Sequence, residues 1–324
     1  MLKILGPIAT LVFVLVAPLS ADAQQPKKVP RVGILVYGNP LGPNPEDSVV
    51  QGLRELGWID GQNFVLVPRY AGGRPERLAD LAAELVRSRV DLIVAMGTDV
   101  VTVARKATDT IPIVMGASED PVEIGLVASL ARPGGNVTGV TFISSEVSGK
   151  RLELLKEAVP GISRVAVLWN PTHVDLDFRE LQVAGRALGV EVHSVEVRSP
   201  EELDGAFRAV ASGRADALVV VPSRLLNLNA KRIAEFALER RLPAVSMWSS
   251  FAEAGGLMTY GPNIPAMIRR AATHADKILK GARPGDLPVE RPTRFDLVIN
   301  LKTANALGLT IPQSLLLRAD RVIQ

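Results

Sequence analysis

The chain has 324 residues, with 37 Lys and Arg against 34 Asp and Glu, 47% hydrophobic residues, 27 Gly, 23 Pro and no cysteine. The Gly and Pro content is ordinary, which excludes collagen-like, low-complexity and disordered architectures. Without cysteine there is no disulfide, thiolate metal site, cysteine nucleophile or lipidated cysteine anchor, and a net charge of +3 without a basic stripe argues against a nucleic-acid partner.

Residues 1–23 predict a cleavable export signal. They combine Lys3, an apolar stretch from Ile4 to Leu19 and the small-x-small site Ala21-Asp22-Ala23. An uncleaved N-terminal anchor is the alternative, but the apolar stretch is shorter than the roughly 20 residues that a membrane helix needs. We therefore expect a mature chain that begins at Gln24, has no membrane anchor and works in a bacterial periplasm.

After this segment, short β-branched runs alternate with helical patterns, which predicts an α/β fold with parallel sheets. Expected strands lie at 32–37, 64–69, 92–96 and 113–115, and residues 140–143 are either a strand or a crossing. One apolar helical face is formed by Leu78, Leu81, Ala82, Leu85 and Val86. A second apolar face predicts a helix over 264–281, which we expect to pack on the first half of the chain.

The second half repeats the pattern of the first. Three pairs of segments match in the same order: 31–40 with 164–171, 91–98 with 216–223, and 111–115 with 242–247. Any two α/β units share some likeness, and that is the alternative interpretation. The shared order favours two similar Rossmann-like lobes.

We expect an N-terminal lobe at 29–142 plus about 262–286, and a C-terminal lobe at 143–261 plus about 287–324. The lobes are joined by crossings near 140–143, 260–262 and 285–288. Three crossings would form a hinge that permits rotation of the lobes but resists their translation.

The sequence contains no catalytic or metal-binding spacing. Its histidines, His173, His193 and His274, are far apart, and the usual Gly-rich nucleotide motifs and the Gly-x-Ser-x-Gly elbow are absent. The acidic pairs Glu119-Asp120 and Asp175/Asp177 are better explained as solvated or capping groups than as an acid/base pair. We therefore predict no catalytic residue, no metal and no cofactor, and a binding protein rather than an enzyme.

Polar and aromatic side chains follow the strand ends in both halves, where open α/β sheets bind ligands. The predicted ligand-binding residues are Tyr37, Asn39, Thr98, Asp99, Ser118, Asp120, Trp169, Asn170, Ser223, Trp248, Ser249 and Tyr260. Four hydroxyl residues among them sit where helices should begin, so that hydroxyl, backbone N–H groups and helix dipole could receive a carboxylate: Thr98, Ser118, Ser223 and Ser249. Plain helix capping without a ligand is the alternative for each.

The charged and aromatic members have their own expected roles. Asp99 and Asp120 are candidates to pair with a ligand ammonium, although Asp120 precedes Pro121 and could simply start a helix. Trp169 and Trp248 could form a stacking surface for a planar or apolar ligand. For Trp169, a place in the core is an equally good interpretation.

With these motifs, the chain resembles bacterial ABC-transporter substrate-binding proteins of the tryptophan/tyrosine-binding type. The resemblance runs from about Arg31 to Arg321 and is most specific at Thr110–Val114, Asp120-Pro121, Gly125–Gly139, Gly149–Lys156, Val165–Pro171, Gly255–Gly261 and Leu287–Pro312. It implies a type I periplasmic-binding-protein fold, capture of a small solute between the lobes, and delivery to a membrane permease driven by a separate ATPase.

The sequence departs from the family at the predicted rim of the site. It has Met247-Trp248-Ser249-Ser250 where a Tyr-containing turn is expected, and Thr259 where Ser is usual. The resemblance therefore implies the place of the site and leaves the ligand open among amino acids, aromatic acids and other small carboxylates. We expect a monomer that closes by hinge rotation, and the alternatives are a ligand-sensing subunit of a membrane receptor or a periplasmic hydrolase on the same fold.

Overall fold

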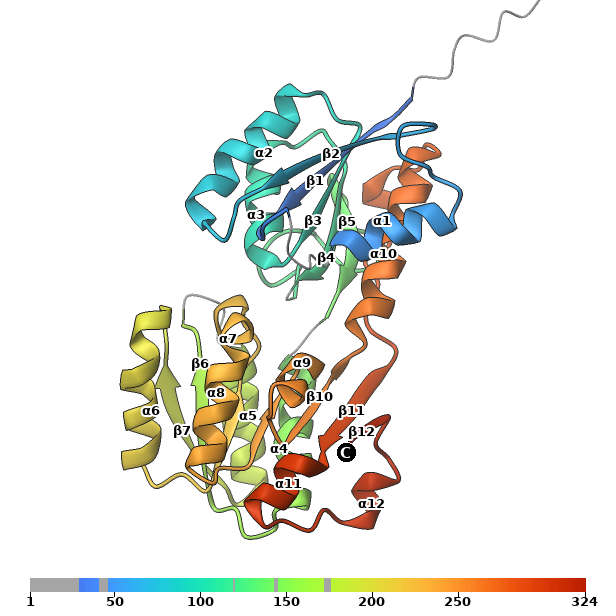
Figure 1. Ribbon diagram of the computed structural model, residues 1–324. Coiled ribbons are helices and arrows are strands. Elements are labelled where there is room, and N and C mark those ends of the chain that lie inside the picture. Colours follow the sequence, from blue (N-terminus) through green and yellow to red (C-terminus); the bar gives the residue numbers. More distant parts are fainter. Residues whose placement is uncertain (1–28, 41–45, 119, 143–144, 172–175) are drawn as a thin grey trace, which may run out of the picture.

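The computed structural model describes residues 29–324 apart from 41–45, 119, 143–144 and 172–175; the predicted export signal lies outside the described residues. Two α/β lobes are stacked one above the other, each built on its own sheet (Figure 1). The five-stranded sheet has the order β2-β1-β3-β4-β5 and the seven-stranded sheet the order β12-β11-β10-β9-β8-β6-β7. The two similar lobes predicted from the repeated sequence pattern are therefore present.

The first lobe contains a sheet whose strands are all parallel. Its strands are β1 (Arg31–Val36), β2 (Val65–Tyr70), β3 (Leu92–Met96), β4 (Ile113–Ser118) and β5 (Val137–Thr141). Its helices are α1 (Glu46–Glu55), η1 (Pro75–Arg77), α2 (Leu78–Arg87), α3 (Thr98–Ala107), α10 (Ile264–Leu279) and η4 (Pro284–Asp286).

Helices cover both faces of this sheet, as parallel strands require. The apolar faces of α1 and α10 pack on one side, and those of α2 and α3 pack on the other. In α2 the buried residues Leu78, Leu81, Ala82 and Leu85 follow the predicted spacing. The helix predicted over 264–281 is also present, ends at Leu279, and contacts α1, β4 and β5.

The second lobe holds the longer sheet. Its strands are β6 (Arg164–Trp169), β7 (Glu191–Glu196), β8 (Ala217–Val220), β9 (Ala244–Ser246), β10 (Met258–Pro262), β11 (Phe295–Asn300) and β12 (Arg321–Ile323). Its helices are η2 (Ser145–Val147), α4 (Ser148–Ala158), α5 (Leu176–Leu188), η3 (Pro200–Glu202), α6 (Leu203–Ser212), α7 (Arg224–Leu228), α8 (Ala230–Glu239), α9 (Ser249–Glu253), α11 (Leu301–Leu307) and α12 (Gln313–Leu316).

One pair of strands departs from the expected parallel arrangement: β10 and β11 are antiparallel. The reason lies in the hinge. The chain leaves the second lobe after β10, forms α10 against the first lobe, and returns into β11 through the same end of the sheet. The outgoing and returning strands are neighbours, so they must run in opposite directions.

The sequence repeat has a structural counterpart at the start of each sheet. In the first lobe the carboxylate of Asp91 accepts a hydrogen bond from the backbone N–H of Arg31 at 2.8 Å. In the second lobe Asp216 accepts the equivalent bond from the N–H of Arg164, also at 2.8 Å. Both carboxylates precede the third strand of their lobe in chain order, β3 or β8, and fix the start of the first strand beside it, β1 or β6.

The hinge lies on one side of the molecule, where the chain passes between the lobes (Figure 1). One crossing follows β5, a second joins β10 to α10, and a third runs from η4 to β11. The third crossing first follows β5, because the N–H of Glu290 donates to Gly139 O at 2.9 Å and its carbonyl accepts from Thr141 N–H at 3.0 Å. The polypeptide therefore stays on the first lobe as far as Glu290.

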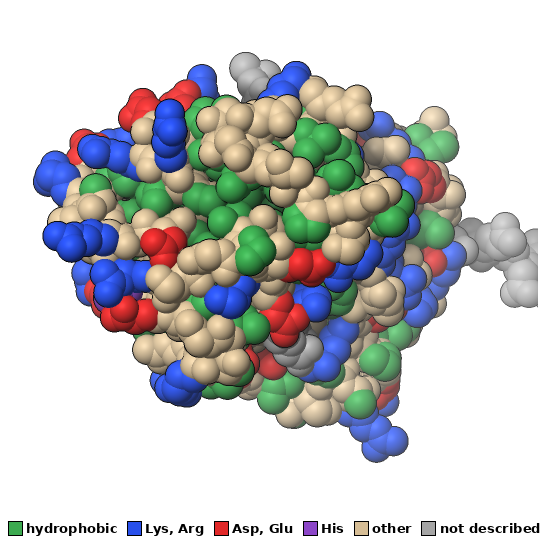
Figure 2. Space-filling model, turned by 90° about the horizontal axis from the view of Figure 1, so that it is seen from below, with side chains coloured by type: hydrophobic (Ala, Val, Ile, Leu, Met, Phe, Trp, Pro, Cys, Tyr) green, Lys and Arg blue, Asp and Glu red, His purple; other side chains and the backbone are tan. Residues whose placement is uncertain are grey.

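Over the described part of the chain, no helix has the length and apolar character needed to cross a lipid bilayer. The end of the second lobe that faces away from the first carries basic, acidic and hydrophobic side chains interspersed with one another (Figure 2).

Candidate functional site

The two lobes meet at the side chain of Arg224, the first residue of α7 in the second lobe. Its guanidinium donates to the Asp99 carboxylate of the first lobe through Nη2 at 3.0 Å and Nε at 3.2 Å. The same Nη2 donates to the carbonyl of Met96 at 3.1 Å, and the guanidinium carbon lies 4.2 Å from the centre of the Tyr37 ring. These contacts join strand ends of both lobes, where ligands bind in folds of this kind.

Local structure positions each partner. Tyr37 follows β1 and Met96 ends β3, while Asp99 lies in the first turn of α3 and also accepts from the N–H of Val100 at 2.9 Å. Ser223 caps α7 by accepting from the N–H of Leu226 at 3.2 Å, which holds Arg224 at the start of the helix.

The contact of Arg224 with Asp99 and Tyr37 is partly shielded from solvent. Burial raises the pKa of the Tyr37 hydroxyl, and the neighbouring Arg224 charge opposes this rise. The side chains of Arg224 and Asp99 are 29% and 32% exposed. Their attraction is therefore less screened than that of a surface pair.

The structure thus brings together several predicted site residues of both lobes: Tyr37, Thr98, Asp99 and Ser223. Asp99 was expected to face a ligand ammonium, but in this structure its charge is met by Arg224. Arg224 itself was missed, although the prediction named the strand end on which it lies. Its position could have identified it, because a cation at a helix N-terminus is repelled by the helix dipole. A cation there is better stabilised by an anionic partner outside its own helix.

Other predicted residues lie apart from this contact. Trp169 is buried in the core of the second lobe, where its ring stacks on Phe178 at 5.1 Å and its N–H donates to Ser194. The core interpretation of Trp169 is the one that the geometry favours. The ring of Tyr260 stacks on Phe295 at 5.9 Å, so it too packs within the second lobe.

The remaining predicted residues occupy loops and strand ends. Asp120 caps the turn at 121–125 by accepting from the N–H groups of Val122 and Glu123, and no helix follows it. Ser118 ends β4 and does not begin a helix, which corrects the predicted capping role. Asn39 is exposed after β1, and Asn170 is buried after β6.

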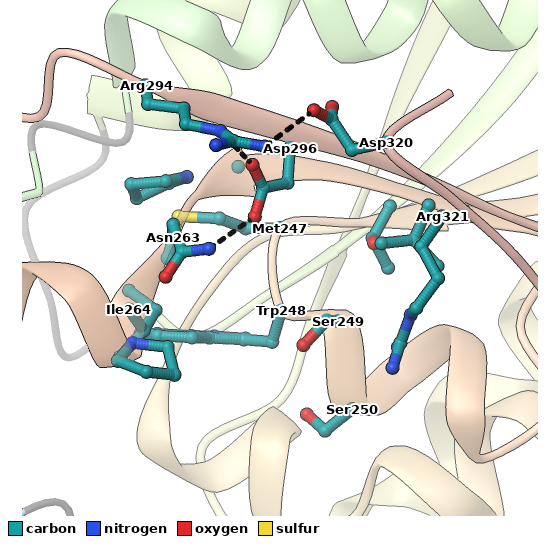
Figure 3. A pocket seen from close by; sticks show the side chains of 15 residues that line it. Met247, Trp248, Ser249, Ser250, Asn263, Ile264, Arg294, Asp296, Asp320 and Arg321 are labelled. Carbon is teal, nitrogen blue, oxygen red and sulfur yellow. Dashed lines mark hydrogen bonds and ion pairs between the residues drawn. The ribbon is translucent and has the colours of Figure 1, made fainter. Parts of the chain in front are cut away.

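Trp248 lies at the hinge, beside two of the three crossings. Its ring meets Phe142, which follows β5, edge-on at 5.7 Å, and it lines a pocket of about 490 Å³ together with Ser249. In Figure 3, Trp248 and Ile264 lie across this pocket from Arg294 and Asp320. Arg294 pairs there with both Asp296 and Asp320, each at 3.1 Å.

The indole N–H of Trp248 differs from those of the other two tryptophans. Trp58 Nε1 donates to Asp276 at 2.9 Å and Trp169 Nε1 donates to Ser194 at 2.7 Å. Trp248 Nε1 is buried, and no acceptor for it exists within the part of the chain that the structure describes. A buried indole N–H normally has a partner, so this donor is an exception among the three tryptophans.

A buried ion pair lies at the base of the hinge and corrects one expectation from the sequence: Asp177, interpreted there as a solvated or capping group, is buried and pairs with Arg151. Arg151 of α4 is fully buried; its Nε donates to Tyr260 O in β10 at 3.1 Å, and its Nη1 lies 3.3 Å from the Asp177 carboxylate. Burial lowers the pKa of the Arg151 guanidinium, and the charge of Asp177 opposes this. Buried polar residues cannot be distinguished from surface ones by local pattern.

Comparison with known proteins agrees with this geometry. A two-lobe fold with facing parallel strand ends and a hinge defines the class of type I periplasmic binding proteins. Residues 44–323 match the family described as ABC transporter substrate binding protein, and the chain belongs to this family. It is a protein of a solute-binding family, and no group of three or more His, Asp or Glu residues suited to a metal occurs among its described residues.

Three relatives are informative. A tyrosine-binding protein of Clostridioides difficile is 28% identical over 287 residues, which are 87% of this chain and 82% of the relative. The structure of an ABC domain in complex with L-Trp from Streptococcus pneumoniae is 27% identical, with a TM-score of 0.81, and covers 91% of this chain and 99% of its own. A ligand-free, open substrate-binding protein from Clostridium difficile is 26% identical, with a TM-score of 0.69, and covers 91% and 100%.

Proposed function

We propose that this chain is the exported solute-binding component of an ABC importer and captures a small carboxylate, such as an amino acid or an aromatic acid, between its lobes. The observation that carries the proposal is the meeting of Arg224 with Tyr37 and Asp99. It puts strand ends of both lobes within hydrogen-bonding distance of each other. A solute held at this rim contacts both lobes at once.

The relatives support the solute class. One is named a tyrosine-binding protein and another was solved with L-Trp. Both ligands combine a carboxylate, an ammonium and an aromatic ring. In this chain the N-terminus of the ten-residue helix α3 at Thr98 matches the carboxylate, and the indole of Trp248 matches the aromatic ring, while the Asp99 carboxylate is already paired with Arg224.

The TM-scores support a closed arrangement of the lobes. The structure superimposes better on the L-Trp complex, at 0.81, than on the ligand-free open protein, at 0.69, although the sequence identities are nearly equal. In this mechanism the solute stabilises the closed form only through the additional contacts it makes there. A membrane permease with its ATPase then recognises the closed form and takes up the solute.

The remaining parts of the proposal concern the cellular setting. The export pattern of residues 1–23 supports a periplasmic location and a mature chain from Gln24. The lobe boundaries that we propose are those expected from the sequence, 29–142 plus about 262–286 for the first lobe and 143–261 plus about 287–324 for the second, except that the first lobe extends to Glu290, which pairs with β5. The protein works as a monomer, binds its solute without turnover and uses no cofactor or nucleic acid.

The test is to purify residues 24–324, unfold them, and identify by mass spectrometry any small molecule that is released. Amino acids and aromatic carboxylates are then screened by thermal unfolding and calorimetry. A solute at 100 times its Kd stabilises the native state by about 2.7 kcal/mol, which raises Tm by several degrees. If every member of both classes leaves Tm unchanged, the proposed solute class is wrong, and a recovered solute that has been chemically altered would indicate an enzyme.

A further inference from the structure

Arg224 and Asp99 occupy equivalent positions in the two halves of the sequence repeat. The segment 91–98 matches 216–223, so the next residue of each half is Asp99 in one and Arg224 in the other. Both lie at the start of the helix that follows the third strand of their lobe in chain order, α3 and α7. The two lobes therefore carry opposite charges at equivalent positions, and in the structure these two residues form an ion pair.

The contact has more parts than a simple surface ion pair. The guanidinium uses its Nε and Nη2 groups on the two carboxylate oxygens, adds the Met96 carbonyl, and lies over the Tyr37 ring. A bidentate arrangement with a carboxylate is the strong geometry for arginine. The stacking on Tyr37 adds a cation–π contribution.

The backbone of the first lobe is shaped to admit this side chain. Gly97 has a φ of +90°, and a Cβ on it would lie 2.5 Å from Arg224 Nη2. Any other residue would therefore be strained in its own backbone and would also push the guanidinium away. The absence of a side chain at position 97 lets Arg224 reach the Met96 carbonyl.

We propose that Arg224, Asp99 and Tyr37 form a latch that holds the lobes together before solute binds, and so sets the affinity for solute through the fraction of closed protein. This inference rests on the proposed function. The contacts of the latch are made entirely by the protein's own groups, so it acts without solute. Arg224 Nη1 has no acceptor among the described residues, so a solute carboxylate can join the latch without displacing Asp99.

The size of the effect follows from the exposure of the pair. A partly exposed ion pair with one aromatic contact shifts an equilibrium by about fivefold rather than by orders of magnitude. The apparent Kd is the intrinsic Kd divided by the closed fraction. Where the closed form is the minority, loss of the latch therefore weakens solute binding by about the same fivefold factor.

The closed fraction is measurable without solute, because the chain has no native cysteine. Exposed Ala79 of α2 and Ala211 of α6 are changed to cysteine and labelled for pulsed electron–electron resonance or single-molecule energy transfer. Both helices lie on the side of the molecule away from the hinge, so opening changes their separation most (Figure 1). The labels are placed in the wild type, Asp99→Asn, Arg224→Gln and the exchange Asp99→Arg with Arg224→Asp.

A matched control exists inside the second lobe. Arg232 makes the same kinds of contact, with the Asp204 carboxylate at 2.5 Å, the Pro200 carbonyl at 3.2 Å and the Phe207 ring at 5.7 Å, but all of them stay within one lobe. Arg232→Gln removes an equal charge without touching the lobe interface. It should leave the interlobe distances unchanged.

In the solute-free protein we expect Asp99→Asn and Arg224→Gln to lower the closed-to-open ratio by about fivefold and the exchange to restore part of it. Salt raised from about 0.05 to 1 M should open the wild type and leave Asp99→Asn unaffected, because screening acts on the charge pair. Identical distance distributions in the wild type and Asp99→Asn would overturn the latch, as would equal opening by Arg232→Gln. A failed solute screen would instead count against the proposed function and leave these distances as they are.

Discussion

At the scale of single residues, the buried indole N–H of Trp248, which has no acceptor among the described residues, is the feature that local pattern could not show. From the sequence, its ring is expected to form a stacking surface, and the structure adds a buried donor without an acceptor in the described part of the chain. An unsatisfied buried donor costs more than a made hydrogen bond contributes. A solute oxygen that accepts from Nε1 removes this cost on binding.

Replacing Trp248 with Phe tests this donor, because the side chain stays aromatic while the indole N–H is lost together with part of the ring. We expect the affinity for the solute to fall by roughly 2- to 12-fold, the range for one hydrogen bond of about 0.5–1.5 kcal/mol, as measured by calorimetry. Trp58→Phe is the control, because its N–H bonds to Asp276 within the first lobe. Equal affinities for the wild type and Trp248→Phe would show that Nε1 does not face the solute.

The buried pair of Arg151 and Asp177 matters for stability. Removing one partner of a buried pair leaves an uncompensated charge and costs about 3–5 kcal/mol. Asp177→Asn is therefore expected to lower the free energy of unfolding by an amount of this order, which urea denaturation measures.

A surface pair on the same helix provides the comparison for Asp177→Asn. Glu157 of α4 pairs with Arg318 at 2.5 Å, but their side chains are 36% and 46% exposed. Glu157→Gln should cost less than about 1 kcal/mol. Similar losses for the two variants would mean that Arg151 finds another partner when Asp177 is neutral.

At the scale of elements, the third crossing is tied to the first lobe through Glu290. Its backbone pairs with β5, and its carboxylate pairs with Arg270 of α10. Partial burial raises the pKa of the Glu290 carboxyl, but the hydrogen bond from Arg270 and the charges of His274, Arg270 and Lys277 outweigh it. The pKa therefore lies below the ordinary 4.5.

The lowered pKa predicts how this crossing responds to acid. A carboxyl whose pKa is lower in the folded state contributes stability above its unfolded pKa and loses it as the pH falls through the folded value. The difference in unfolding free energy between wild type and Glu290→Gln should therefore be largest above pH 4.5 and shrink below it. Urea denaturation between about pH 3 and 5.5 measures this difference, and a constant value over that range would contradict the expectation.

The crossings also explain a strand direction that the alternating pattern did not predict. A parallel α/β sheet follows from β-α-β repetition, and the pattern continues through β10. The helix after β10 then packs on the other lobe, so its return strand enters from the hinge. Strand direction at this edge depends on where α10 packs, which a single amphipathic face does not specify.

At the scale of the whole molecule, the two lobes share one sequence pattern of strands and helices. They differ in charge where they meet, because one lobe carries Asp99 and the other Arg224. The matching of 91–98 with 216–223 made Thr98 and Ser223 equivalent from sequence alone. It did not predict that the next residues, Asp99 and Arg224, would face each other. That pairing depends on how the two lobes are placed against each other, which the matching of the segments does not contain.

The amino-acid sequence by itself determined the α/β class, the two-lobe repeat, the apolar faces of α2 and α10 and the family. These follow from periodicity and local motifs, which act over a few residues. Only the tertiary structure decided that Trp169 and Tyr260 pack in the second lobe, that Arg151 is buried, and that Arg224 reaches Asp99. These depend on contacts between residues far apart in the chain, and burial and charge pairing have no local signature from which to predict them.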